Sequence, residues 1–197
     1  MAIGPWETLG ERQLVKTKWL DARVETCRTP SGAIIDDYMV LHYTDWSLAV
    51  ALTPDRRLVM TRQWRQGAQM MSLECAGGVV DPGETPAQAA ARELLEETGY
   101  RGEEAGRLVA LSPNPAIIRN HLYATLFTDC EPVTAAEEKA GEVLETVVMT
   151  GAEVYAQIQS GALDNALQVA ILLSLFARRP DLLEPDLLEP DLLESGR

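Results

Sequence analysis

The chain is poor in the features that build disulfide frameworks and membrane spans. Its 197 residues include three cysteines, Cys27, Cys75 and Cys130, which lie far apart in the sequence. This spacing argues against a disulfide framework and favours a reducing compartment such as the cytoplasm. The longest apolar run, residues 169–177, is interrupted by Ser174 and is far shorter than the roughly 20 residues that a membrane helix needs. The first residues show no basic stretch followed by an apolar one, so we expect no secretory signal.

Basic residues are scarce too. The chain has 17 Lys and Arg against 30 Asp and Glu, which gives a formal net charge of −13. Such a protein is a poor general partner for nucleic acids or anionic membranes, so we expect neither and look for a small-molecule substrate. A hydrophobic content of 46% with 24% charged residues is ordinary for a globular protein. The length fits one domain, or one domain with a tail.

Runs of β-branched and aromatic residues between turn residues predict a β-rich body. We expect one or two strands in residues 15–27, and further strands at residues 34–43, 46–52, 58–64, 106–111, 120–128 and 145–149. Helices are expected at residues 86–98, 152–160 and 164–177. This combination predicts an α+β protein in which helices cover both faces of a sheet.

The end of the chain is a repeat. Pro-Asp-Leu-Leu-Glu occurs three times between Pro180 and Glu194. Each proline interrupts a helix, and a period of five residues fits neither a strand nor a continuous helix. We favour a solvated, disordered tail, with a packed arm or a partner-binding segment as the alternative. The chain then divides into an N-terminal β segment (1–45), a main domain (46–179) and the tail (180–197).

Residues 78–100, GVVDPGETPAQAAARELLEETGY, are the most informative segment. The Asp-Pro-Gly sequence predicts a turn. Thr85 is a suitable N-cap for a helix that begins at Pro86, and Gln88 stands where a capping box requires it. Gly99 suits a left-handed C-terminal cap.

On this helix Glu93, Glu96 and Glu97 stand at i, i+3 and i+4, so their side chains share one face. Like charges at this spacing repel each other, and a hard divalent cation such as Mg²⁺ would relieve the repulsion. Arg92 lies four residues before Glu96 and can hold a carboxylate in place. A solvated, Glu-rich surface helix is the alternative. It does not explain the turn, the arginine or the glycines.

The spacing G-x5-E-x7-R-E-L-x-E-E-x-G resembles the Nudix box of hydrolases that cleave a pyrophosphate linked to another moiety. The matching residues are Gly78, Glu84, Arg92, Glu93, Leu94, Glu96, Glu97 and Gly99. Tyr100 departs from the aliphatic residue that usually follows. The resemblance implies a Nudix-type α/β/α sandwich with a mixed β-sheet in residues 46–179. It also implies that residues 1–45 form an N-terminal antiparallel β extension that mediates dimerisation.

The resemblance also assigns roles. It implies metal ligation by the side chains of Glu93, Glu96 and Glu97 and by the backbone carbonyl of Gly77. Glu96 and Glu97 are then catalytic through the metal, with Arg92 holding the carboxylates. The cofactor would be Mg²⁺, with Mn²⁺ as a substitute.

A proton acceptor is expected in the acidic loop of residues 137–142. Glu138 is the first candidate for the general base, although the closest-aligned position is Ala140, which cannot serve. Glu142 best matches a metal-contacting position. A solvated run of charges is the alternative for this loop.

Segments outside the box resemble the ADP-ribose pyrophosphatase and nucleoside diphosphate sugar branch of the family. Residues 63–65, Gln-Trp-Arg, resemble that branch's Gln-Tyr-Arg, and residues 73–78, Leu-Glu-Cys-Ala-Gly-Gly, resemble its Leu-Glu-Leu-Pro-Ala-Gly. Residues 112–115, Ser-Pro-Asn-Pro, fall where the branch carries a diagnostic proline. From this likeness we take Arg65, Trp64 and Glu74 as substrate contacts.

Arg28 is a weaker candidate for a phosphate contact, or for a contact across a dimer. Trp64 is alternatively a core or interface aromatic. The resemblance implies Mg²⁺-dependent hydrolysis of ADP-ribose or a related nucleoside diphosphate sugar by a homodimer. The alternatives are a Nudix hydrolase of dinucleoside polyphosphates or nucleoside triphosphates, and a non-catalytic nucleotide-binding module.

Overall fold

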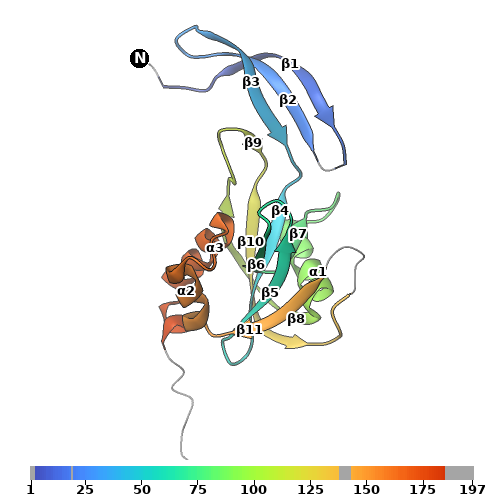
Figure 1. Cartoon of the computed structure of the whole chain (residues 1–197), viewed down its shortest axis with the longest axis vertical. Coiled ribbons are helices and arrows are strands. Elements are labelled where there is room, and N and C mark those ends of the chain that lie inside the picture. The colour runs from blue at the N-terminus through green and yellow to red at the C-terminus, as the bar shows by residue number, and fades with distance from the viewer. Residues whose placement is uncertain (1–2, 19, 138–142, 185–197) are drawn as a thin grey trace, which may run out of the picture. The chain divides into compact units, whose positions relative to one another are not determined.

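The computed structural model describes residues 3–18, 20–137 and 143–184 (Figure 1). It divides the chain into two compact units. The first unit comprises Met1–Trp46 and Ala110–Tyr123, and the second comprises Ser47–Val109 and Ala124–Arg197. The first unit therefore contains the N-terminal β segment together with residues 110–123, which follow the box in the sequence.

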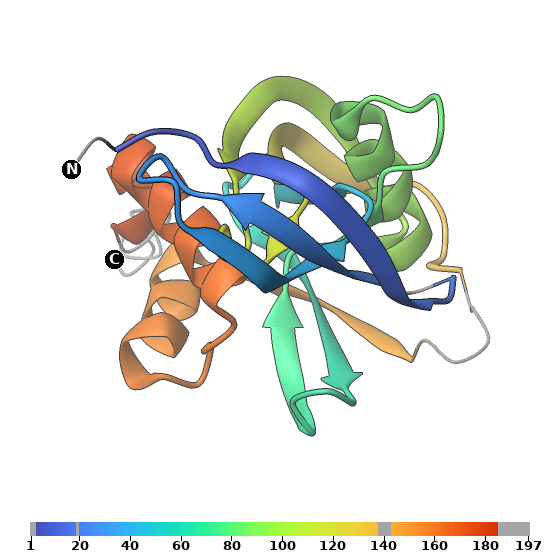
Figure 2. The same ribbon diagram turned by 90° about the horizontal axis from the view of Figure 1, so that it is seen from above.

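The first unit is built on a sheet with the strand order β1-β2-β3-β9, of which Figure 2 shows the first three strands in blue. β1 (Glu7–Lys16), β2 (Asp21–Arg28) and β3 (Ile34–His42) pair antiparallel, and β9 (Ile118–Arg119) pairs parallel with β3. The sequence predicted β1 only from residue 15. Its earlier residues are too polar to read as a strand, and pairing with β2 supplies the backbone hydrogen bonds that place them in one.

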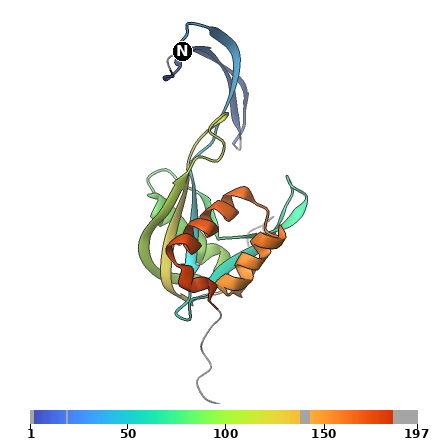
Figure 3. The ribbon, with the colours of Figure 1, turned by 90° about the vertical axis from the view of Figure 1, so that its left-hand side faces the viewer.

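The second unit is a layered α/β structure. Its sheet has the order β11-β5-β4-β10-β8, with β6 paired to β5 and β7 to β4. These strands are β4 (Trp46–Leu52), β5 (Leu58–Arg65), β6 (Met70–Glu74), β7 (Gly77–Val79), β8 (Tyr100–Leu111), β10 (Leu122–Pro132) and β11 (Leu144–Met149). The helices are α1 (Pro86–Thr98), α2 (Gly151–Ser160) and α3 (Ala166–Arg178). Figures 1 and 3 show α1 on one side of the sheet and α2 with α3 on the other, which confirms the predicted α+β sandwich.

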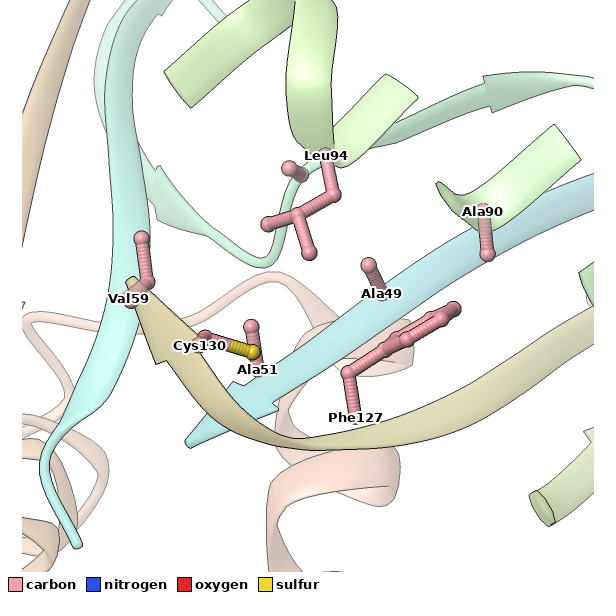
Figure 4. Close-up of a cluster of buried hydrophobic side chains, with 8 residues drawn as sticks. Ala49, Ala51, Val59, Ala90, Leu94, Phe127 and Cys130 are labelled. Carbon is pink, nitrogen blue, oxygen red and sulfur yellow. The ribbon is translucent and has the colours of Figure 1, made fainter. Parts of the chain in front are cut away.

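The core beneath α1 explains why that helix lies close to the sheet. Buried side chains meet there, as Figure 4 shows, and most of them are small: Ala49, Ala51, Val59, Ala76, Ala90, Leu94, Phe127 and Cys130. Because alanines line both the helix and the strands, the two backbones approach closely. Residues next to this contact are therefore held in fixed positions.

The cysteines and the tail complete the fold. Cys27, Cys75 and Cys130 are free and buried. Within the described residues, no helix is long and apolar enough to span a bilayer. The favoured prediction of a disordered tail is wrong for the first repeat, because Pro180–Leu183 forms a 3₁₀ turn in which Leu182 is buried. The other repeats, in residues 185–197, lie outside the described residues.

Candidate active site

Caps at both ends fix the position of α1. The Thr85 side chain accepts a hydrogen bond from the backbone N–H of Gln88, whose own side chain accepts from the N–H of Thr85. Gly99 ends the helix in the left-handed conformation, with φ of 74°. A Cβ there would stand 2.1 Å from the backbone oxygen of Thr134, so both the conformation and the space require glycine.

Two of the three glutamates on the box helix, Glu93 and Glu96, lie against Arg92. Glu93 and Glu97 are 9% and 8% exposed, and Glu96 is partly buried. Arg92 Nη1 lies 2.6 Å from Glu93 Oε1 and 3.4 Å from Glu96 Oε2. One guanidinium therefore offsets part of the repulsion between carboxylates that are largely removed from water.

The same arginine ties α1 to the turn before it. Arg92 Nε and Nη2 donate to the two oxygens of Glu84 at 2.9 and 3.1 Å, and Nη2 also donates to the carbonyl of Val79 at 3.1 Å. The hydrogen bonds to Glu84 and then to Glu93 raise the pKa of Arg92. The hydrogen bonds from Arg92 lower the pKa of Glu84 below its ordinary value. The arginine thus stays charged and holds Glu84 ionised.

Two glycines let the chain pass close to the carboxylates. The N–H of Gly77 donates to Glu97 Oε2 at 3.0 Å. A Cβ on Gly77 would stand 2.3 Å from the backbone oxygen of Ser47, and a Cβ on Gly78 would stand 2.4 Å from Glu93 Oε1. Any larger residue would push this strand away from the helix or displace Glu93.

The donors gathered here fit a hard divalent cation. The side chains of Glu93, Glu96 and Glu97 offer carboxylate oxygens, which Mg²⁺ and Mn²⁺ prefer. Because Gly78 has no side chain, its backbone lies directly beside the carboxylate of Glu93. The residues therefore suit the predicted metal, and the ligand set itself stays a prediction.

Arg65 and Glu74 form a second charged pair in the second unit. Arg65 Nε and Nη2 donate to the two oxygens of Glu74 at 2.8 and 2.5 Å. Glu74 is only 3% exposed. Its burial favours a higher pKa, but hydrogen bonds from Arg65, Ser72 and Asn165 outweigh burial and lower the pKa. Glu74 thus orients the half-exposed guanidinium, and a direct substrate contact by either residue stays a prediction.

The other two predicted contacts lie on the surface. Trp64 is 52% exposed, so it is not a core residue, and its Nε1 donates to Gln66 Oε1 at 3.0 Å. Arg28, in the first unit, forms an ion pair of 2.7 Å with Glu7. A role in stacking on a base or in binding phosphate stays a prediction for each.

The acidic loop is expected to hold the general base and a further metal contact. Glu138 and Glu142 lie outside the described residues. The segment that precedes them is anchored on α1, because the N–H of Glu137 donates to the backbone oxygen of Glu96 at 2.8 Å. Glu137 itself therefore lies beside the box helix.

The proline-containing segment lines a pocket of about 630 Å³ within the first unit. Ser112 and Pro115 form part of its wall, and the rings of Trp6 and Tyr38 form another part. Glu25, also in the wall and 3% exposed, pairs with Arg119 at 2.9 Å. The sequence singled out the prolines but not the pocket.

The sequence did not identify two residues at the start of α3 that contact the site. Gln168 accepts a hydrogen bond from the backbone N–H of Cys75 at 2.9 Å, and Asn165 bonds the carboxylate of Glu74. The available signal was a glutamine directly before the apolar run of residues 169–177 in the expected helix. Only the fold brings residue 168 next to residue 75.

The fold and the box together define a Nudix hydrolase. Residues 44–167 match the model of the NUDIX domain, and the chain belongs to this family. Residues 6–41 match the model of the nucleoside diphosphate sugar hydrolase N-terminal domain. The crystal structure of an ADP compounds hydrolase superposes with a TM-score of 0.80 at 20% identity, covering 92% of this chain and 97% of the other, which shows the shared fold.

Curated relatives agree in class. The ADP-ribose pyrophosphatase of Bacillus subtilis is 28% identical over 68% of this chain and 70% of its own length. The ADP compounds hydrolase NudE of Escherichia coli is 31% identical over 43% of this chain and 46% of its own length. The ADP-sugar pyrophosphatase of Mus musculus is 34% identical over 44% and 37%. The last two matches thus span less than half of those relatives.

Proposed function

We propose that this enzyme hydrolyses the pyrophosphate bond of ADP-ribose or a related nucleoside diphosphate sugar and releases a nucleoside monophosphate and a sugar phosphate. The observation that carries the proposal is the largely buried carboxylate pair of Glu93 and Glu97 beside Arg92 and the two glycines. The match of residues 6–41 to the nucleoside diphosphate sugar hydrolase N-terminal domain favours this substrate class.

The cofactor in this proposal is Mg²⁺, with Mn²⁺ as a substitute. When bound, a divalent cation lowers the pKa of water and neutralises charge on the transferring phosphoryl group. Glu93, Glu96, Glu97 and the carbonyl of Gly77 would hold it. Arg92 keeps the carboxylates in position through its bonds to Glu84 and Glu93.

Charges around the box serve binding and proton transfer. Arg65, oriented by the buried Glu74, presents a half-exposed guanidinium suited to the two-pronged binding of phosphate oxygens. Glu138 accepts the proton of the attacking water, and Glu142 adds a metal contact. Both roles belong to the proposal.

The assembly and the compartment are also proposals. We infer a homodimer formed through the first unit, whose strand β1 is exposed along its whole length. A net charge of −13 supports a small-molecule substrate rather than nucleic acid or a membrane surface. Three free, buried thiols are consistent with a reducing cytoplasm.

The proposal is tested by following products from a panel of substrates: ADP-ribose, GDP-mannose, UDP-glucose, a diadenosine polyphosphate and dGTP. Each is assayed with Mg²⁺, with Mn²⁺ and with EDTA. We expect turnover of the nucleoside diphosphate sugars that EDTA abolishes. In ¹⁸O-labelled water, the label should appear in one of the two monophosphate products, because water attacks phosphorus.

Other outcomes point elsewhere. Preference for the diadenosine polyphosphate or dGTP would replace the substrate class but keep the chemistry. Binding of the panel without turnover of any member, under every metal condition, would identify a nucleotide-binding module instead.

A further inference from the structure

The short connection between β6 and β7 is held from three directions. The carbonyl of Ala76 accepts a hydrogen bond from the N–H of Ala49 at 2.8 Å, on the side of the sheet. The N–H of Gly77 donates to Glu97 at 3.0 Å, on the side of α1. The N–H of Cys75 donates to Gln168 Oε1 at 2.9 Å, on the side of α3. Three different elements, β4, α1 and α3, therefore fix two peptide units of this connection: the one between residues 74 and 75 and the one between residues 76 and 77.

Gln168 is an unexpected residue at its position. It is 3% exposed and lies one turn before the fully buried Ile171 and Leu172 of the same helix. Burying a side-chain amide stabilises a fold only when its hydrogen bonds are made. The bond that the structure gives it is the one to Cys75, the residue at which the ladder of β6 has ended.

The start of α3 also holds Glu74, the residue before Cys75. Asn165, the N-cap of α3, bonds the carboxylate of Glu74, which in turn orients Arg65. Two side chains from the start of α3 thus fix Glu74 and Cys75, while α1 fixes Gly77. The matched family region ends at residue 167, one position before Gln168.

From this geometry we infer that Gln168 is a positioning residue for the metal site. By holding the N–H of Cys75, it sets where the carbonyl of Gly77 points and keeps the N–H of Gly77 on Glu97. This inference rests on the proposed function, because it takes Gly77 and Glu97 as ligands of the divalent cation. Residues that orient metal ligands through hydrogen bonds typically change metal affinity by about 10- to 100-fold when they are removed.

The test compares Gln168→Met with the parent protein. Methionine fills a similar volume but leaves the N–H of Cys75 without an acceptor. We expect the Kd for Mn²⁺, measured by calorimetry without nucleotide, to rise about tenfold. Amide hydrogen exchange at residues 75–77 should accelerate. The kcat at saturating metal should fall much less than the metal affinity.

Two further variants separate positioning from stability. Ile171→Val removes a buried methyl group from the same helix and should lower Tm while leaving the Mn²⁺ Kd unchanged. Gln168→Glu keeps an acceptor oxygen at the same reach and should bind Mn²⁺ within about threefold of the parent, because the hydrogen bond to Cys75 is retained.

The results distinguish the two proposals. A Mn²⁺ Kd for Gln168→Met within twofold of the parent would overturn the role of Gln168 alone. An equal loss of Mn²⁺ affinity in Ile171→Val would also overturn this role. So would a Gln168→Glu protein that binds Mn²⁺ as weakly as Gln168→Met does. If the parent takes up no divalent cation, the proposed function fails, and this role fails with it.

Discussion

Strands β1 and β4 show how differently the two units are built. All ten residues of β1 are exposed, whereas β4 buries six of its seven residues between helices and neighbouring strands. The second unit has a core on which a rigid site can rest. The first unit presents Leu9, Leu14 and Val15 to solvent on its outermost strand, and these are side chains that the proposed dimer would cover. The comparison teaches that the proposed metal site and the proposed dimer surface belong to different units.

The largest expected effect comes from the second unit. Glu97→Gln keeps the size of the side chain and an acceptor for Gly77, but removes the charge. We expect kcat to fall about 100-fold or more, because a metal ligand is weakened, with an unchanged circular dichroism spectrum. Glu104→Gln, on the exposed part of β8, is the control and should keep parental activity. Parental turnover in Glu97→Gln would remove the metal role of the box.

The first unit should respond in assembly rather than in chemistry. Leu14→Lys combined with Val15→Lys places two charges on β1, and we expect the dimer to dissociate at least tenfold more readily, because apolar area is lost and like charges face each other. Light scattering over a dilution series measures this. Leu173→Lys is the matched control, because Leu173, like Leu14, is 41% exposed but lies on α3 of the second unit. If the parent protein is a monomer at every concentration, the proposed dimer is wrong.

A smaller effect is expected from Arg65. Arg65→Ala should raise KM about tenfold and lower kcat little, because the proposed contact with phosphate would be made equally in the ground and transition states. Arg62→Ala is the control, since Arg62 pairs with the exposed Glu145 on the neighbouring strand. Equal falls in kcat and kcat/KM would instead place Arg65 in the chemical step.

The smallest effect is in the acid stability of the second unit. Glu74 has a lowered pKa, so its ionised form stabilises the fold above its unfolded pKa, and that contribution is lost as the pH falls through the folded pKa. The difference in Tm between the parent and Glu74→Gln should be full above about pH 5, where the carboxyl of the unfolded chain is ionised. It should vanish as the pH falls below the lowered pKa of folded Glu74. Glu145→Gln, at an exposed pair, should show little difference at any pH. A Glu74→Gln difference that persists in acid would contradict this.

Local rules were sufficient for the box helix. The capping residue, the proline after it and the terminal glycine act within one turn, and α1 begins and ends where they predict, from Pro86 to Thr98. The polar strand β1 and the start of β8 at Tyr100 were missed, because both are glutamate-rich and contain glycine, and pairing with neighbours places them in the sheet. The sequence suggested the metal ligands, but their burial follows from packing.

The amino-acid order alone determined the family, the box and the expected cation, because those depend on spacing along one helix. Only the tertiary structure decided which distant residues support that helix. Gln168 reaches Cys75 across 93 positions of the chain, and Arg119 reaches the buried Glu25. Such partners are brought together by sheet order and helix docking, which depend on the burial of the whole core rather than on any local pattern.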